Sequence, residues 1–587
     1  MGHYSIGSDG HHRPMRASVV TELIEQRGGV PACEIKDQFG LDGVICDLVS
    51  RHDNARLLCV CRQLSMDIRP FVWTHTDAVE VLIGMIPESR IETYVNEPFA
   101  PYRTMYLPRS LDLSRLGVYS PYITRLDIPL TMLVNRYENW NGFLSSLVAQ
   151  EVDLLPNLEH LRIALSRDTR GERIPSEAFH WAVAFMSSSL LSFQVYPDVE
   201  WDTDSKYFSH AWVGLDMATY LLLVLSKKCL KLSSLNFLPG NIKLKVEGVL
   251  THPRLGYFAE KVPVLAKFWA PLQKIHLMIP RFQCLRSLSA TPYILEPATF
   301  VALSKLPCLE SLSIRDVQLD SDWQVYCYKL GSELTEQSFP ALRYLDLIEI
   351  VYDTLIHICS QRPLARALYN LKPAIIWSDV RRNQLAHLLG LLAKYRSPVK
   401  RLCLAHIPLN WGLLPHSMTY LSFLKLTHLS VPRPNGLNYE MAQLAHAAPG
   451  LESLEFNQWM CSSDFELNEL RFIATLWPNL QQLSLPIASS SAERLEELEP
   501  TFRGPHSLKP FYLESYFYDE EEDLGEPIPT GQNPLAKHVD KIARYLHTLW
   551  PTVECKAKRF PPYFEDLTDL NNLNDCISRL RSQPPVS

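Results

Sequence analysis

Cys59 and Cys61 form the only closely spaced cysteine pair in the sequence. The surrounding residues are helical in pattern. On a helix, residues i and i+2 point to different faces, so the two thiols are poorly placed to share one metal ion. We interpret them as thiols of an apolar core. The sequence contains no G-x-x-x-x-G-K-[ST], G-x-G-x-x-G, G-x-S-x-G or H-E-x-x-H pattern, so the common phosphate-binding, hydrolase and zinc-protease motifs are missing.

Two polar segments carry side chains that could bind an ion or a charged partner. His3, His11 and His12 could hold a metal loosely, but a disordered polar tail is the simpler interpretation. The acids from Asp519 to Asp523 could attract a basic partner, although such runs are usually solvated. Four tryptophans are expected to be core or repeat-edge residues: Trp140, Trp201, Trp212 and Trp477. We therefore expect no catalytic residues, no cofactor and no metal, and hence a chain that is not an enzyme.

The bulk composition is that of a soluble globular protein. The 587 residues are 47% hydrophobic and 21% charged, with a net charge of −7, which gives no basic field for nucleic acid. The thirteen cysteines are scattered, and several, such as Cys308 and Cys403, sit in apolar runs, which favours free thiols in a reducing compartment. The N-terminal residues lack the apolar segment of a secretory signal, and the most apolar run, 217–226, is too short to cross a bilayer. We expect a cytoplasmic or nuclear protein that does not bind a membrane.

A short phrase recurs from about residue 105 onward: an apolar residue, often Pro, and then L-x-x-L-x-[LIVF]. The clear copies lie at 155–163, 306–314, 339–347, 448–456 and 477–485. Weaker copies lie at 122–128, 190–195, 230–238, 271–279, 398–404 and 426–431. The L-x-x-L part turns the chain around a corner, and the alternating L-x-[LIVF] part predicts a short strand with one buried face. Each phrase therefore predicts one corner and one strand.

Helix-like stretches separate the phrases, for example at 296–306, 383–395, 438–448 and 466–477. Leu451 and Leu480 are 29 residues apart, and Leu309 and Leu342 are 33 residues apart. Periods of this size indicate a solenoid in which each unit buries its apolar side against its neighbours. We predict an α/β fold: a leucine-rich-repeat-like horseshoe of short parallel strands and helices, preceded by a small all-α module.

The predicted domain boundaries follow from these changes in sequence pattern along the chain. Residues 1–20 are expected to be a disordered tail, 21–95 a small helical module and 105–504 the solenoid. An acidic loop insertion rich in Pro and Gly is expected at 505–534. The last repeat and a closing helix are expected at 535–587.

The stretch 53–73, DNARLLCVCRQLSMDIRPFVW, carries more apolar residues than one buried helix face requires. One stripe has helical spacing: Leu57, Val60, Cys61, Leu64 and Ile68. A second group lies off that stripe: Ala55, Leu58 and Cys59. Such a helix suits a module that packs both on itself and on a partner.

The longer stretch 44–73 resembles the F-box, a short three-helix module that docks on a Skp1-like adaptor. The positions that match in register are Ile45, Val49, Asp53, Arg56, Leu57, Val60, Cys61, Arg62, Pro70 and Trp73. The sequence departs from the family pattern at Asp37-Gln38, where Leu-Pro is usual, and at Cys46 and Ala55. Segments 72–87 and 114–128 also resemble those that follow the F-box in fungal F-box proteins with irregular leucine-rich repeats.

This resemblance implies a substrate-recognition subunit of a cullin-type (SCF) ubiquitin ligase. The adaptor-binding residues would be Ile45, Val49, Asp53, Leu57, Val60, Cys61, Leu64, Pro70 and Trp73, and the solenoid would hold an unknown protein substrate. Three other interpretations stay open: a protein-binding scaffold whose degenerate F-box does not bind the adaptor, an enzyme with its site in 505–534, and an N-terminal segment at 44–73 that only shields the first repeat.

Overall fold

The computed structural model describes residues 62–94, 102–129, 134, 136–164, 176–195, 213–236, 239–240, 275–315, 334–350, 352–375, 384–404, 415–432, 437–457, 465–488, 511–518, 534–557 and 568–582. Its main feature is one sheet of fifteen strands, all paired in parallel and ordered as they occur in the chain. The strands are β1 (His75–Thr76), β4 (Arg125–Pro129), β6 (His160–Ala164), β7 (Ser192–Gln194), β9 (Ser234–Asn236), β11 (Ser287–Ala290), β12 (Ser311–Arg315), β13 (Tyr344–Ile350), β14 (Asn370–Ile375), β15 (Arg401–Cys403), β16 (His428–Pro432), β17 (Ser453–Asn457), β18 (Gln482–Ala488), β19 (Phe511–Tyr518) and β20 (Val553–Ala557).

Helices alternate with these strands along the chain. The α-helices are α5 (Arg62–Trp73), α6 (Val79–Gly84), α7 (Trp140–Gln150), α8 (Ser176–Phe185), α9 (Leu215–Lys228), α12 (Ile275–Met278), α13 (Pro297–Ser304), α14 (Tyr352–Cys359), α15 (Arg362–Ala367), α16 (Gln384–Lys394), α17 (Pro415–Leu421), α18 (Leu437–Ala447), α19 (Glu469–Leu476), α20 (Pro534–Leu549) and α21 (Thr568–Ser582). Short 3-10 helices are η1 (Leu116–Val118), η2 (Ser120–Tyr122), η5 (Ile279–Arg281) and η6 (Pro292–Leu295).

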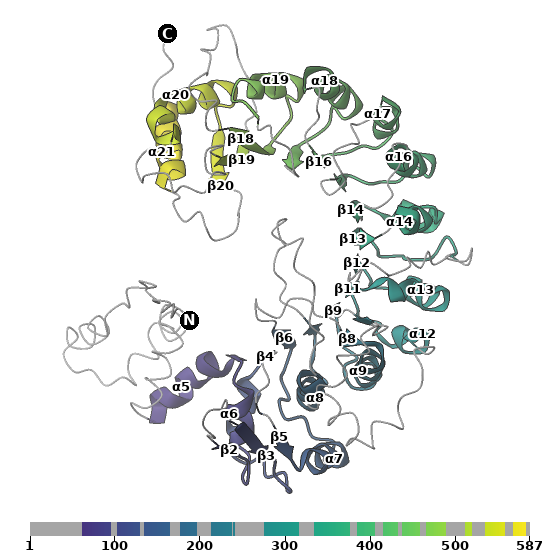
Figure 1. The fold of residues 1–587 in the computed structure, drawn as a ribbon, viewed down its shortest axis with the longest axis vertical. Helices are drawn as coiled ribbons and strands as arrows, with labels where there is room; N and C mark the ends of the chain where they lie inside the picture. The colour runs from purple at the N-terminus through teal and green to yellow at the C-terminus, as the bar shows by residue number, and fades with distance from the viewer. Residues whose placement is uncertain are drawn as a thin grey trace, which may run out of the picture.

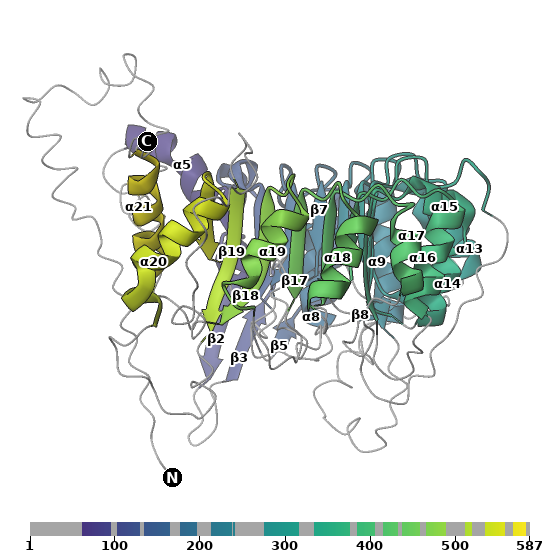
Figure 2. The same cartoon turned by 90° about the horizontal axis from the view of Figure 1, so that it is seen from above.

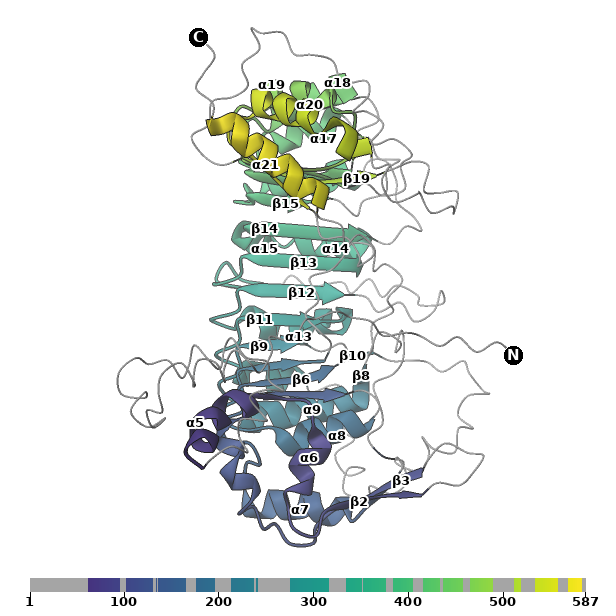
Figure 3. The same cartoon turned by 90° about the vertical axis from the view of Figure 1, so that its left-hand side faces the viewer.

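The strand–helix units are arranged in an open arc (Figure 1). The strands line the inner, concave side and the helices cover the outer, convex side, while the first and last units face each other across the opening. Figure 2 shows the later strands side by side with their helices, and Figure 3 shows the strands stacked as a ladder. The α/β class and the parallel strands expected from the sequence are confirmed.

One column of apolar side chains runs through the whole sheet and explains why the phrase makes strands. Residues that pair in register, such as Leu126, Leu161 and Leu454, point into the space between sheet and helices and are at most 1% exposed. Burial of each such leucine contributes on the order of 2 kcal/mol. Backbone hydrogen bonds also join each unit to the one before it. For example, the N–H groups of Glu159 and His160 both donate to the carbonyl of Thr124.

Two smaller sheets lie beside the first units. Strands β2 (Arg90–Tyr94), β3 (Tyr102–Tyr106) and β5 (Arg136–Glu138) form one of them, in which β2 and β3 are antiparallel and β3 and β5 are parallel. Strands β8 (Val213–Gly214) and β10 (Pro239–Gly240) form the other. The described end of the arc beyond β20 is covered by α21, whose Asn574 side chain bonds both the N–H and the carbonyl of Cys555. This side chain occupies the hydrogen-bonding groups that another strand would use.

Most phrase copies become strands, but one does not. The copy at 271–279 contains α12, a helix over Ile275–Met278, and the strand of that unit is β11 at Ser287–Ala290. The apolar residues of 271–279 also recur at three and four residues, so the pattern suits a helix as well as a strand. The expected helices at 296–306, 383–395, 438–448 and 466–477 correspond to α13, α16, α18 and α19.

Two domain predictions need correction. The range 21–95 is not wholly helical, since β1 is the first strand of the large sheet and β2 also lies within it. The range 505–534 is not wholly a loop, because Phe511–Tyr518 forms β19 between β18 and β20. The remaining residues of that range, with the acidic run, and the tail at 1–20 lie outside the described residues.

Candidate functional site

The concave face of the sheet is formed by the strands, and the described helices of the arc cover the other face (Figure 1). Side chains alternate across a strand, so the residues on either side of the buried leucine column point to the concave side. At the N-terminal end of the arc these positions carry His75 on β1, Arg125 and Asp127 on β4, and Arg162 on β6. From β7 to β12 they carry serine, glutamine and asparagine, and charged side chains return further along, for example Asp346, Lys372 and Arg401.

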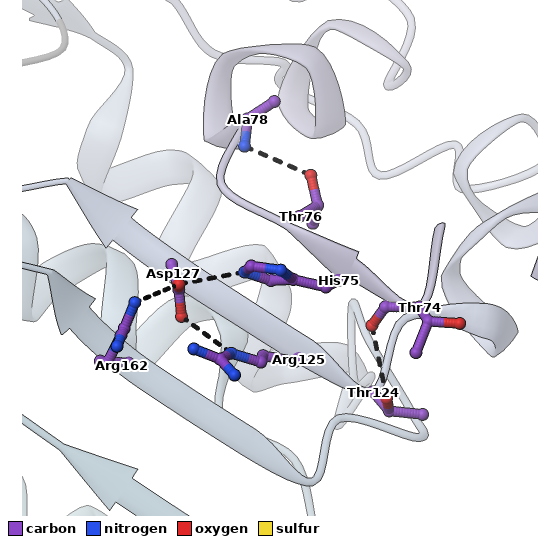
Figure 4. Close-up of polar contacts among 8 residues, drawn as sticks. All are labelled: Thr74, His75, Thr76, Ala78, Thr124, Arg125, Asp127 and Arg162. Carbon is purple, nitrogen blue, oxygen red and sulfur yellow. Dashed lines mark hydrogen bonds and ion pairs between the residues drawn. The ribbon is translucent and has the colours of Figure 1, made fainter. Parts of the chain in front are cut away.

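The N-terminal positions form a charged cluster around one carboxylate (Figure 4). The Oδ2 atom of Asp127 lies 2.7 Å from Nη2 of Arg162 and 3.0 Å from Nε2 of His75, and Oδ1 lies 3.4 Å from Nε of Arg125. The Asp127 side chain is only 7% exposed, while those of Arg125 and His75 are 42% and 43% exposed. The carboxylate is therefore the buried centre of the cluster, and the cationic groups reach toward solvent.

Opposing effects set the pKa of the Asp127 carboxyl. Burial raises it, but the hydrogen bond and charge of Arg162, together with the bonds to His75 and Arg125, outweigh burial and hold the pKa below its usual range. Asp127 is thus ionised at neutral pH and compensates one of the two arginines. The cluster keeps at least one unit of positive charge, since two guanidinium groups face a single carboxylate.

The next units carry no charge at the same positions. Ser192, Ser234 and Ser287 continue the column that contains His160, and Gln194 and Asn236 continue the column that contains Arg162. Asn236 is 9% exposed, and its Oδ1 atom has no hydrogen-bond partner among the described residues. The first third of the concave face is therefore a small basic patch beside a neutral floor that can form hydrogen bonds.

The sequence did not single out the charged cluster. Its residues occupy the positions marked x in the recurring phrase, for example Asp127 in 122–128 and Arg162 in 155–163. Aligning the phrase copies and reading down the x columns would have placed these side chains on one face. The leucines of the phrase report only which side chains are buried.

The predicted adaptor-binding residues are only partly within the described structure. Ile45, Val49, Asp53, Leu57, Val60 and Cys61 lie outside the described residues. Leu64, Pro70 and Trp73 belong to α5. Along this helix Ile68 and Val72 are buried, whereas Met66 is 55% exposed and Phe71 is 37% exposed. Within the described chain, α5 therefore packs one face on the arc, while Met66 on the opposite side and Phe71 at the edge of the buried face are exposed to solvent.

Trp73 has a structural role that the sequence did not indicate. It precedes the buried β1 residue Thr76 by three positions, as Ile123 precedes Leu126, so it occupies the corner position of the first unit. Its ring lies 5.0 Å from that of Tyr119, and the guanidinium of Arg69 lies 5.3 Å from the same Tyr119 ring. Trp73 anchors α5 to the arc, which limits how much of its side chain an adaptor could contact.

Other kinds of site find little support among the described residues. No group of three or more His, Cys, Asp or Glu side chains there is arranged to hold a metal. The described cysteines are free thiols; Cys229 is buried, while Cys308 and Cys403 are only half-buried. None of the described helices is both long and apolar enough to span a bilayer. No protein-family model matches the chain.

Proposed function

We propose that this chain is the substrate-recognition subunit of a cullin-type (SCF) ubiquitin ligase. In this proposal the F-box-like segment 44–73 docks on a Skp1-like adaptor, and the leucine-rich-repeat-like arc holds a protein substrate. The chain itself performs no covalent chemistry and binds neither nucleic acid nor membrane. It raises the concentration of substrate near the reacting thioester of the ligase, and it works in the cytoplasm, the nucleus or both.

The observation that carries this proposal is the register in which 44–73 matches the F-box, together with the exposure of Met66 on α5. Met66 lies on the side of the helix away from the buried Ile68 and Val72, whereas Phe71 lies at the edge of the buried face. The exposed Met66 continues the doubled apolar pattern of 53–73, and this supports docking of a second protein.

A scaffold that does not bind an adaptor is the second candidate. It is favoured by the packing of Trp73 on Tyr119, because that contact uses an F-box position for the arc itself. It is also favoured by Asp37-Gln38, which replaces the usual Leu-Pro. Both candidates keep the arc as a protein-binding surface and differ only in whether the N-terminal segment engages the adaptor.

Co-purification with a Skp1-like adaptor from the same organism separates the two candidates. We expect the wild-type chain to retain the adaptor, and Leu57→Asp/Val60→Asp and Met66→Asp to lose it. Val148→Asp is the matched control, because Val148 is 77% exposed on α7, away from α5. Equal retention by all four chains, or by none, would favour the scaffold.

A further inference from the structure

We propose that the concave face from β4 to β11 binds an extended peptide segment of a partner protein, with an anionic side chain of that peptide held by Arg125, His160 and Arg162. The anionic group is a carboxylate or a phosphate ester, which share the same recognition chemistry. This proposal deepens the proposed function, since it names the class of substrate that the arc would hold.

The charge balance of the cluster provides the anchor. Asp127 compensates one guanidinium, and the side chains of Arg125 and Arg162 remain 42% and 25% exposed. Arg125 pairs directly with the exposed His160, so the two lie about 5 Å apart on neighbouring strands, and Arg162 is on the same face of β6. Two arginines and a histidine on one face suit an oxyanion that accepts several hydrogen bonds at once.

The buried carboxylate also orders the cationic groups in advance. Because Asp127 holds Arg162 and Arg125 from below, their side chains lose little conformational freedom when they meet an anion. The exposed Asp77 follows Thr76 on the same side of β1 as His75, but none of the ion pairs among the described residues joins Asp77 to an arginine of the cluster. The two arginines therefore share one bonded carboxylate, which leaves them able to bind a further anionic group.

The neutral floor beside the anchor suits a peptide backbone. Ser192, Ser234 and Ser287 are small, so an extended chain can approach the sheet closely at these positions. Nucleic acid is disfavoured because the chain has a net charge of −7 and the basic patch is small.

Peptide selection on the purified full-length chain, without adaptor, tests the proposal. The probe is a phage-displayed library of random 12-residue peptides, read by sequencing. We expect Asp or Glu to be enriched at one position, and we expect Arg162→Gln to abolish that enrichment. The selected peptide is then synthesised with Glu, Gln or phosphoserine at that position. Its affinity should fall about tenfold with Gln, and the ratio of the Glu to the phosphoserine affinity identifies the preferred anion.

The controls make the outcome decisive. Arg401→Gln is the matched control, because Arg401 is exposed on the same face of β15, outside the proposed site; it should leave the enrichment unchanged. Arg125→Gln repeats the test if Arg162→Gln does not fold. Absence of acidic enrichment, or equal losses in Arg162→Gln and Arg401→Gln, overturns the proposal. The proposal is also overturned if acidic peptides are enriched only after the acids at 519–523 are replaced by amides. In that case the chain's own acidic run would occupy the proposed site. None of these results bears on adaptor binding, which the co-purification measures separately.

Discussion

His180 should make the N-terminal half of the arc sensitive to acid. This residue lies on α8, is 4% exposed, and its ring centroid lies 5.9 Å from that of Trp140. Its Nε2 atom has no hydrogen-bond partner among the described residues. Burial alone lowers the pKa of His180 to about 4, because the apolar surroundings disfavour the imidazolium.

The sign of the effect follows from proton binding. In the unfolded chain His180 takes up a proton near its ordinary pKa of about 6.5, whereas the folded chain does so only near 4. Between these values the unfolded state binds more protons, so the free energy of unfolding falls as pH falls. Between pH 7 and pH 5 the loss is about 2 kcal/mol, and below pH 4 it approaches about 3 kcal/mol.

Hydrogen exchange at the amides of α8 is the suitable assay, because a repeat array need not unfold in one step. We expect the local opening free energy of the wild-type chain to decrease by about 2 kcal/mol from pH 7 to pH 5, and that of His180→Phe to decrease much less. Phe179→Leu on the same helix is the control, since it removes packing without changing a titratable group and should shift both values equally. A wild-type and a His180→Phe chain with the same pH dependence would refute the argument.

Three further outcomes are expected. Asp127→Asn should destabilise the first units by about 1–3 kcal/mol, measured by urea unfolding, because the amide leaves two arginines without their counter-charge. The wild-type advantage should be complete above about pH 4, the ordinary pKa of an Asp carboxyl, and should be lost as pH falls through the lower pKa that Asp127 has in the fold. Asn574→Ala should speed hydrogen exchange in β20 and leave β4 unchanged, because it removes both side-chain bonds to the backbone of Cys555. Iodoacetamide at pH 8 should modify the exposed Cys284 and spare Cys229 in the folded chain, because burial raises the pKa of the Cys229 thiol to about 12. Mass spectrometry of tryptic peptides would measure the alkylation of each cysteine.

The strands that were predictable from sequence share one property. Their phrases end in a large apolar residue, as in Leu161-Arg162-Ile163 of β6. Strand β11 was missed because the corresponding position is Ala290, and β14 because it is Pro373. A small residue or a proline at the end of the phrase removes the alternation that marks a strand, while the parallel pairing with neighbouring strands still holds it in the sheet.

Strand β19 shows a different limit. Its Leu513 joins the buried column, but the phrase around it begins with Pro510 and ends with Ser515, and five acids follow soon afterwards. Local composition therefore favoured a loop. Pairing with β18 on one side and β20 on the other overrides that preference, because most of the strand's stability comes from its neighbours in the array.

The candidate site was hidden for a related reason. Alternation in a strand tells which residues are buried, whereas the function of the exposed positions depends on which strands become neighbours. Asp127 and Arg162 are 35 residues apart in the chain and meet only because β4 pairs with β6 in one register. A shift of β6 by one residue would turn Arg162 into the core and take it away from Asp127. The charged cluster is thus a product of the register, which no single copy of the phrase contains.

The proposed adaptor segment and the proposed peptide site are joined almost without a linker. Helix α5 ends at Trp73 and β1 begins at His75, so one residue, Thr74, separates the helix of the proposed adaptor segment from a side chain of the charged cluster. The carbonyl of Thr74 accepts the N–H groups of Thr124 and Arg125, which fixes this connection to the next unit. An adaptor bound to α5 would therefore hold the concave face in one orientation. If the chain is the ligase subunit proposed above, a rigid connection of this kind converts binding at one end into a defined place for the substrate at the other.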